Sequence, residues 1–365
     1  MGTTKIDRRK LALRLQEDIY ERELAAGERV GSIRRLAMRY HVSPLTISRL
    51  FADMTEAGVL YRDEKGFFCV KNQPLRKPHI GYAGTPLTPD GSFRDCLSAS
   101  ATNSLFNTLE KLNSQPRIIG YHELCIPELA RERLKGINGL LLQNSFIDEK
   151  TTDILQNSNI HIVRIGQAFS QDNELNCSEV VQHFDPAFDE FVRYCDLKSY
   201  RKIINLYSQH SNALALARKV EKFLQQQNLK SVAENMRLKA LSSNQAEVET
   251  FSFFMDLPPR DWSNTLIISG SGYFSRGIYR AFRQQQIDMP DILSIDNLDD
   301  YEKSPLFDEP YITAIDRNMD KIYRDAAQLL YDQVRNSDER KVIIKVPAKL
   351  VIRKSITHVR KDYQG

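Results

Sequence analysis

The sequence predicts an α+β winged helix–turn–helix at residues 1–72, followed by a larger α/β part with doubly wound parallel sheets. Two amphipathic segments separated by a tight turn, and two strand-like segments that flank a second turn, support the first part. Short apolar runs that alternate with helical patterns after residue 78 support the second, because strands separated by helices form parallel sheets. A chain of 365 residues is long enough for two or three domains.

The centre of the first part is a helix that should begin at Pro44. Ser43 can accept a hydrogen bond from the first helical turn, and Pro44 suits the first helical position because its φ is fixed and it lacks an N–H. One face of this helix is apolar: Ile47, Leu50, Phe51 and Met54. Ser32 should cap a shorter helix upstream, and the link His41-Val42 permits only a tight turn between the two helices.

Two further features complete the first part. Residues 59–62 and 67–70 are strand-like and flank the turn Asp63-Glu64-Lys65-Gly66, which predicts a two-stranded wing. Residues 6–24 carry an apolar stripe at helical spacing, which predicts a helix that packs under the one beginning at Pro44.

Composition excludes several classes of protein. The net charge is +4, and the whole excess of positive charge lies within residues 1–72. This distribution favours a nucleic-acid partner for residues 1–72 rather than for the remainder of the chain. No apolar run is long enough for a membrane helix and the first residues do not resemble a signal peptide, so we expect a cytoplasmic protein. The five cysteines contain no C-x-x-C pair, so we expect reduced thiols and no metal site.

The first part resembles the winged helix of the GntR family. The similar segments are 27–37, 42–49, 58–60 and 66–70, although Gly31 stands where that family often has proline. The resemblance implies binding to double-stranded operator DNA, with arginines on phosphates or guanine edges, the helix start in the major groove and a glycine at the wing tip. The residues implied are Ser32, Arg34, Arg35, Ser43, Pro44, Thr46, Arg49, Lys65 and Gly66. Of these, Arg35 and Lys65 are also explained as solvated surface charges.

Residues 73–78, with a proline near each end, predict an interdomain linker. The second part then runs from residue 79 to the C-terminus, and its length favours two lobes. The predicted strands are the apolar runs at 117–120, 139–142, 160–165, 202–206, 265–268 and 292–295.

The second part resembles the effector domain of the LacI/GalR family. The similar landmarks are 137–142, 160–165, 199–204, 289–292, 311–316 and 347–355, with a helix expected from Met319. The resemblance implies two periplasmic-binding-protein-like lobes around a hinge, a homodimer, and a small sugar or sugar-derived effector.

A ligand in such a fold lies at the carboxyl ends of the strands. The candidate effector-binding residues there are Ser92, Phe93, Asn144, Asp185, Tyr207, Arg218, Lys219, Ser271, Tyr273, Asp296 and Asn297. Gly272 stands where the family commonly has a carboxylate, so hydroxyl recognition should depend more on Asp296, Asn297 and a cation, with Tyr273 stacking on an apolar face of the ligand. Each candidate is also explained as a loop residue, and Asp296 as a turn residue.

Enzyme signatures are absent, and no cofactor is expected. No G-x-S-x-G, G-x-x-x-x-G-K-[ST] or H-E-x-x-H occurs, and the stretch from Gly270 to Ser275 lacks the third glycine of a dinucleotide loop. An aminotransferase-like domain with pyridoxal phosphate, known in some GntR-type proteins, is the enzymatic alternative. The other alternative is an architectural DNA-binding protein without an effector. The two resemblances together imply a transcriptional regulator of a carbohydrate utilisation operon, with repression relieved by an inducer as the expected direction.

Overall fold

The computed structural model describes residues 8–22, 24, 27–71, 78–84, 96–143, 149–158, 160–166, 175–209, 211–239, 243–258, 260–300, 309–336 and 338–363. The chain divides into two compact units, Met1–Pro78 and His79–Gly365. Each unit has a hydrophobic core of its own.

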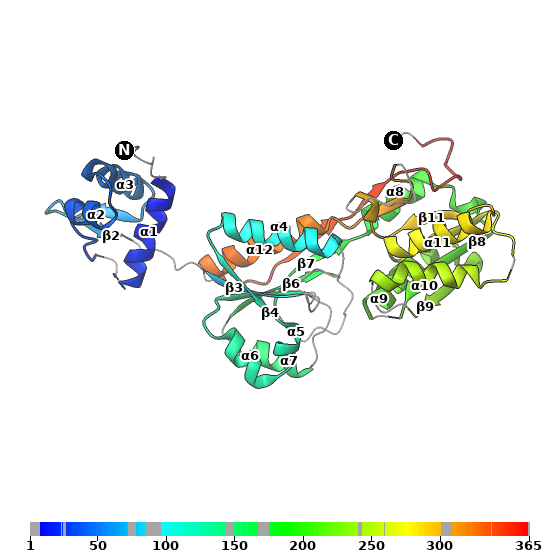
Figure 1. The fold of residues 1–365 in the computed structure, drawn as a ribbon, viewed down its shortest axis with the longest axis horizontal. Helices are drawn as coiled ribbons and strands as arrows, with labels where there is room; N and C mark the ends of the chain where they lie inside the picture. The colour runs from blue at the N-terminus through cyan, green and yellow to red at the C-terminus, as the bar shows by residue number, and fades with distance from the viewer. Residues whose placement is uncertain are drawn as a thin grey trace. The chain divides into compact units, whose positions relative to one another are not determined.

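The described residues of the N-terminal unit form three helices and one hairpin (Figure 1). They are α1 (Arg8–Glu21), α2 (Ile33–Arg39), α3 (Pro44–Glu56), β1 (Leu60–Arg62) and β2 (Phe68–Val70). The strands pair antiparallel, with Tyr61 opposite Cys69. The core is formed by all three helices and both strands.

The caps of α2 and α3 confirm the predicted helix starts. The Ser43 hydroxyl accepts a hydrogen bond from the Thr46 amide at 3.1 Å, and Pro44 is the first residue of α3. Ser32 caps α2 in the same way, with the Arg35 amide at 3.2 Å. The apolar face of α3 is buried as predicted: Ile47, Leu50, Phe51 and Met54.

The first lobe of the C-terminal unit is built on a six-stranded sheet in the order β13-β7-β6-β5-β3-β4, in which every pair is parallel. Its strands are β3 (His79–Ala83), β4 (Gln115–Ile119), β5 (Gly139–Gln143), β6 (His161–Gly166), β7 (Ser178–His183) and β13 (Ile343–Pro347). Its helices are α4 (Cys96–Lys111), α5 (Tyr121–Leu124), α6 (Pro127–Leu134), α7 (Glu149–Gln156) and α12 (Met319–Asn336).

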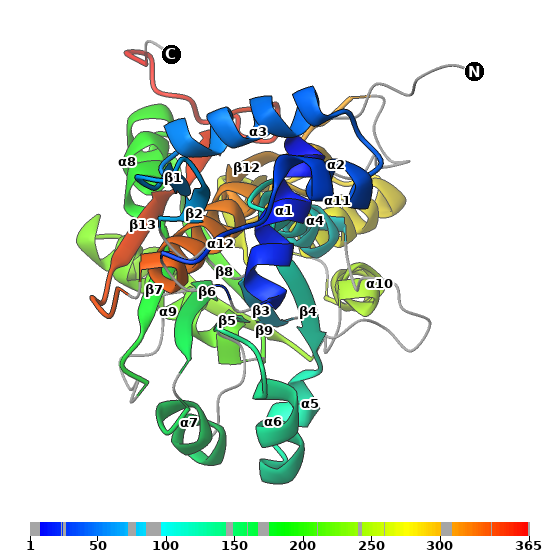
Figure 2. The ribbon, with the colours of Figure 1, turned by 90° about the vertical axis from the view of Figure 1, so that its left-hand side faces the viewer.

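The helices of this lobe cover both faces of the sheet. Successive residues of β5 alternate between two core clusters, with Leu141 facing α4 and α12 and its neighbours Leu140 and Leu142 facing α6 and α7. Figure 2 shows α4 and α12 together on one side of the strands and α6 and α7 on the other. Strands buried on both faces explain the uninterrupted apolar runs in the sequence.

The second lobe is built on a six-stranded sheet in the order β14-β12-β11-β10-β8-β9. Its strands are β8 (Lys202–Ser208), β9 (Ala233–Leu238), β10 (Thr265–Ser269), β11 (Asp291–Ser294), β12 (Thr313–Asp316) and β14 (Lys349–Val351), and its helices are α8 (Asp185–Tyr194), α9 (Ser211–Gln226), α10 (Ser243–Met255) and α11 (Gly272–Gln285). Short 3-10 helices lie at η1 (Leu197–Ser199), η2 (Lys230–Val232) and η3 (Leu298–Asp300). Helices α8 and α9 pack on one face, and α10 and α11 pack on the other.

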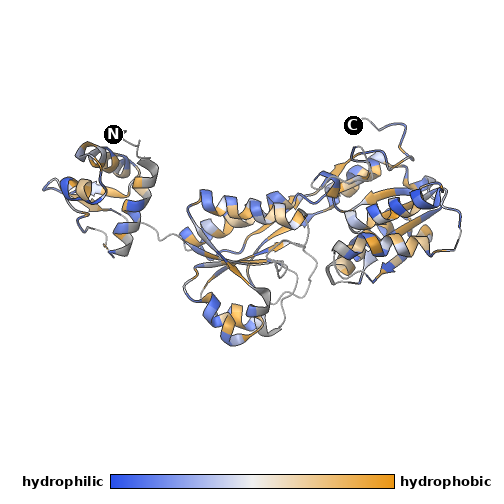
Figure 3. Cartoon of the chain, in the orientation of Figure 1, coloured by the Kyte–Doolittle hydropathy of each residue, from blue (hydrophilic) through white to orange (hydrophobic). Residues whose placement is uncertain are grey.

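The prediction of parallel strands is wrong for β14, which pairs antiparallel with β12. The chain leaves the second lobe at the end of β12 and re-enters it through β13 and Ala348 on the same side, where Lys349 pairs with Asp316, so β14 runs opposite to β12. Figure 3 shows hydrophobic strands in both lobes and helices whose outer faces are hydrophilic.

Along the described segments, the chain passes between the two lobes three times. The passages join β7 to α8, β12 to α12 and β13 to β14. Two of them are held together by a hydrogen bond of 2.8 Å, from the Ala348 amide to the His183 carbonyl.

Among the described residues, no helix is both long and apolar enough to cross a membrane.

Candidate functional site

The outer surface of α2 and α3 carries the arginines that were predicted to contact DNA. Arg34, Arg35 and Arg49 are exposed, and none of them makes an ion pair within the described part of the chain. The first turn of α3 contains no acidic residue, so the positive end of the helix dipole is not neutralised there. This surface combines free guanidinium groups with an anion-attracting helix end.

Other arginines of the same unit are engaged in structure. Arg39 pairs with Asp18 of α1 at 2.9 Å, and the Tyr40 hydroxyl donates to the same carboxylate. Burial, with Asp18 next in effect, raises the pKa of Tyr40. The guanidinium of Arg29 lies 3.6 Å from the centre of the Phe67 ring and 3.5 Å from Asp63. The unit therefore contains arginines that pair within it and arginines that make no ion pair with the described residues.

The hairpin tip between β1 and β2 is a tight turn organised by Asp63. Its carboxylate accepts hydrogen bonds from the amides of Lys65 at 3.0 Å and Phe67 at 2.8 Å. Desolvation raises the pKa of Asp63, but these hydrogen bonds and the nearby Arg29 outweigh it and hold the pKa below its usual value. Gly66 has φ +80°, a conformation that side chains rarely adopt, and Lys65 beside it is exposed.

The hydroxyl groups among the predicted DNA contacts act first as helix caps. The Ser43 Oγ lies 2.8 Å from the Thr46 Oγ1 in addition to its bond from the Thr46 amide. The Ser32 hydroxyl accepts a hydrogen bond from the Arg35 amide. Each hydroxyl oxygen has a second lone pair, so capping and a phosphate contact are compatible.

At the carboxyl end of β11, Asp296 and Asn297 are held by charged neighbours. Asp296 pairs with Arg317 at 2.9 Å. The buried Asn297 donates to Asp300 at 2.6 Å, and its carboxamide oxygen accepts from Arg353 at 2.6 Å. Arg353 also pairs with Asp300 at 2.7 Å. The two strongest effector candidates therefore belong to one polar network.

Arg317 extends that network to the first lobe. It lies in the passage from β12 to α12, and with the Gln182 carboxamide oxygen turned toward it, hydrogen bonds of 3.0 and 3.2 Å form. Gln182 is a buried residue of β7. Asp296 in the second lobe is thus joined through Arg317 to a strand of the first lobe.

A second ion pair lies just behind this network. Arg276 of α11 donates through Nε and Nη2 to Asp299 Oδ1 at 3.1 and 3.0 Å, and both side chains are buried. The other carboxylate oxygen, Oδ2, has no hydrogen-bond partner among the residues that the structure describes. Gly272 lies nearby, and a Cβ there would come within 2.4 Å of the Leu298 Cβ. In this packing, any side chain at position 272, a carboxylate included, would clash with Leu298.

The other candidates are dispersed over the C-terminal unit. Asp185 begins α8, 3.3 Å from His183, and is close enough to Lys219 to oppose the lowering of the Lys219 pKa by burial. Arg218 is exposed on α9.

Tyr207 is the sixth residue of β8, which pairs with β10. The chain continues from β10 to Ser271, the cap of α11, and then to Tyr273 in the first turn of that helix. Tyr273 packs against the core cluster under α10 and α11. The remaining candidates, Ser92, Phe93 and Asn144, lie outside the described residues.

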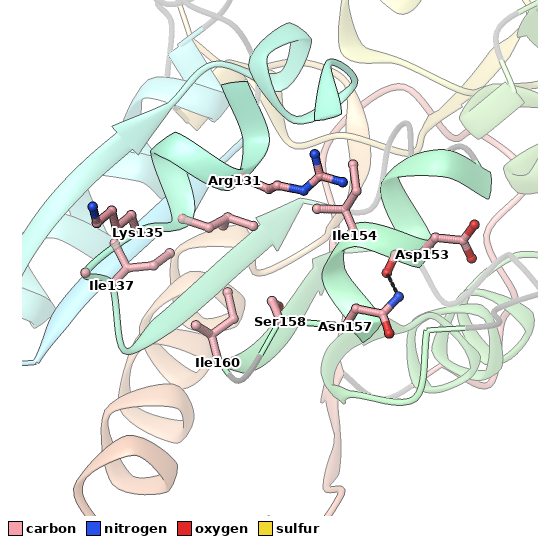
Figure 4. Close-up of a pocket in the computed structure, with 10 residues that line it drawn as sticks. Arg131, Lys135, Ile137, Asp153, Ile154, Asn157, Ser158 and Ile160 are labelled. Atoms are coloured by element: carbon pink, nitrogen blue, oxygen red, sulfur yellow. Dashed lines mark hydrogen bonds between the residues drawn. The ribbon is translucent and has the colours of Figure 1, made fainter. Parts of the chain in front are cut away.

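The structure also contains a pocket that the sequence did not indicate. It has a volume of about 640 Å³ and lies between α6 and α7, with Leu134, Ile137 and Ile160 among its lining residues. Figure 4 shows the Arg131 side chain extending from α6 toward Ile154 of α7. The residues before β5 and β6 line it, so it lies at the amino ends of these strands and contains none of the predicted effector residues. Among the described residues, no cluster of three or more metal-ligating side chains occurs.

Comparison with known proteins identifies the architecture of the C-terminal unit. Residues 192–356 match the model of the periplasmic binding protein-like domain. The C-terminal unit has a periplasmic-binding-protein-like fold. Its two lobes with parallel sheets confirm that part of the predicted fold class, and the aminotransferase-like alternative does not fit it.

Solved structures of bacterial regulators share this fold at low sequence identity. A ribose-bound LacI family regulator from Enterococcus faecium has a TM-score of 0.59 and 15% identity, covering 77% of this chain and all of its own. The regulator CelR in complex with cellobiose has a TM-score of 0.59 and 14% identity over 86% of this chain and 91% of its own. The trehalose repressor from Escherichia coli has a TM-score of 0.55 and 18% identity over 76% of this chain and all of its own. No curated protein matches the sequence.

Proposed function

We propose that this chain is a cytoplasmic, one-component transcriptional regulator that binds operator DNA through residues 1–72 and a small sugar through residues 79–365. The observation that carries the proposal is the combination of a capped helix with free arginines and a unit whose fold is shared with sugar-bound regulators. We assign the N-terminal unit to the GntR type of winged helix and residues 73–78 to a linker.

In this proposal α3 enters the major groove and the β1–β2 hairpin lies along the adjacent minor groove. Arg34, Arg35 and Arg49 contribute charge-assisted bonds to phosphates or to guanine edges, because guanidinium groups fit both. Gly66 allows the hairpin tip to approach the backbone closely, with Lys65 next to it. Binding of this kind releases counterions, so the affinity falls steeply as salt is raised.

The effector site is proposed at the carboxyl ends of the second-lobe strands. Asp296 and Asn297 supply oxygen and amide groups for sugar hydroxyls, Ser271 and Tyr273 border the start of α11, and Asp185, Arg218 or Lys219 supplies charge. A sugar that bonds Asp296 competes with Arg317, and through Arg317 with Gln182 of the first lobe. The effector would therefore bind the two lobe arrangements with different affinities, which allostery requires, and would shift the equilibrium between them. In a homodimer, that change alters the spacing of the two DNA-binding units, and release of a repressor is the expected result.

A thermal-shift screen tests the proposal. The full chain is melted alone and with pentoses, hexoses, deoxysugars, disaccharides and their phosphates. A ligand at 100 times its Kd stabilises the folded state by about 2.7 kcal/mol. We expect one compound or a small chemically related set to raise the melting temperature. An equal response to all compounds, or to none, would contradict a sugar effector.

A further inference from the structure

The DNA-facing side of α3 combines one arginine with an apolar residue at its start. Positions 45, 48, 49 and 52 form a single exposed stripe at helical spacing, opposite the buried apolar face. The stripe is Leu45, Ser48, Arg49 and Ala52. Leu45 is 59% exposed, and Met38 at the end of α2 is 72% exposed. A helix that binds a polyanion thus presents a hydrocarbon side chain where its first turn begins.

Neither side chain is explained by packing within the described N-terminal unit. The partly buried apolar residues that pack on its core are Ala12, Ile33, Tyr40, Val42, Val59 and Phe68, and neither Leu45 nor Met38 is among them. The exposed Phe67 of the hairpin differs, because the Arg29 guanidinium covers its ring. Leu45 is therefore available to a partner.

We propose that Leu45 selects DNA sites by contacting the C5-methyl group of a thymine in the major groove. Leucine cannot donate or accept a hydrogen bond, and the thymine methyl is the apolar group that base pairs present in that groove. Four residues of helix separate Leu45 from Arg49, a rise of about 6 Å, which is close to two base-pair steps of about 3.4 Å each. Each half-site should therefore contain a thymine within about two base pairs of the guanine or phosphate contacted by Arg49. This inference rests on the proposed function.

The experiment begins with the full chain and a random-sequence duplex library, from which bound duplexes are enriched. In the enriched duplex, each thymine is then replaced singly by deoxyuridine, which removes the methyl group and leaves base pairing intact. Burial of one methylene-sized group corresponds to about a fourfold change in affinity. We expect one replacement in each half-site to weaken wild-type binding about fourfold, and the Leu45→Ala variant to bind the thymine and deoxyuridine duplexes equally.

The matched control is Ile343→Ala, which removes a 63% exposed apolar side chain from the C-terminal unit and should retain the full thymine preference. Circular dichroism melts confirm that Leu45→Ala remains folded. If a duplex is enriched but its affinity ignores every methyl group, or if Leu45→Ala keeps the wild-type thymine preference, the inference is overturned while DNA recognition stands. If no duplex is enriched, the proposed function fails and the inference falls with it.

Discussion

The surface of α3 and the carboxyl edge of the second-lobe sheet use arginine in opposite ways. On α2 and α3, the guanidinium groups of Arg34, Arg35 and Arg49 are exposed and make no ion pair with the described residues. At the sheet edge, Arg317, Arg353 and Arg276 are each paired with an aspartate. Free surface charges suit a partner that brings its own dense charge, such as DNA. At the sheet edge, a small ligand would have to compete with ion pairs that already exist.

Separating the two regions should have the largest effect. We expect residues 75–365, expressed alone, to fold as a dimer that binds the effector and has lost DNA binding completely, because all the free arginines of α2 and α3 are removed. Sedimentation gives the oligomeric state, and a mobility-shift assay gives DNA binding. A monomer would contradict the dimer, and retained site-specific DNA binding would contradict the division of labour.

Breaking a paired arginine at the sheet edge should mainly affect stability. Asp299→Ala leaves the buried Arg276 without its carboxylate, and breaking a buried pair lowers the free energy of unfolding by about 3–5 kcal/mol. Replacing both partners, with Arg276→Met and Asp299→Leu, should recover most of the lost free energy of unfolding. Urea denaturation measures both variants. The control is Asp362→Ala, which removes an exposed partner of Arg360 and should change little. Equal destabilisation by the single and double variants would contradict the ion-pair explanation.

Removing a free arginine should affect DNA binding alone. Arg49→Ala should weaken binding to a selected duplex by about 1–3 kcal/mol, since Arg49 lies off the buried face of α3 and makes no ion pair in the described chain. The melting temperature and effector affinity should not change. Arg340→Ala, an exposed arginine of the other unit, is the control for net charge. An unchanged mobility shift would remove Arg49 from the interface.

Asp296 tests whether the paired network also binds the effector. Asp296→Ala should weaken effector binding about tenfold or more, at about 1.4 kcal/mol per decade, because sugar hydroxyls lose an acceptor. DNA affinity without effector should stay the same. Calorimetric titration measures the loss, and Asp332→Ala on the exposed side of α12 is the matched control. Wild-type ligand affinity in the Asp296→Ala variant would leave Asp296 only its structural pairing with Arg317.

Local sequence patterns predicted much of the fold because their causes are local. The start of α3 follows from Ser43 and Pro44, and the central strands follow from apolar runs such as 139–142, which lies within β5. The predicted strands did not include β3, β7, β9, β12, β13 or β14. In β9, exposed residues alternate with less exposed ones and half of the residues are polar or charged, so it lacks the signal of a strand buried on both faces.

The site was harder to predict because its contacts join distant parts of the chain. Asp296 and Asn297 were chosen for their place after a strand, but their partners Arg317 and Arg353 are reached only when β12 and the segment after β14 close on β11. Gly272 was recognised as a departure from the family pattern, while the clash that a side chain there would make with Leu298 depends on a tertiary contact. The sequence shows which charged residues are present, but the pairs that they form depend on the tertiary structure.

The most direct test of the whole account is the DNA affinity of the full chain with and without the sugar that stabilises it. Fluorescence anisotropy with the selected duplex measures both affinities at one salt concentration. Coupling between two sites typically amounts to 1–3 kcal/mol, or about 5- to 150-fold in affinity. The account predicts that saturating sugar weakens DNA binding at least fivefold. The same DNA affinity with and without bound sugar would contradict it.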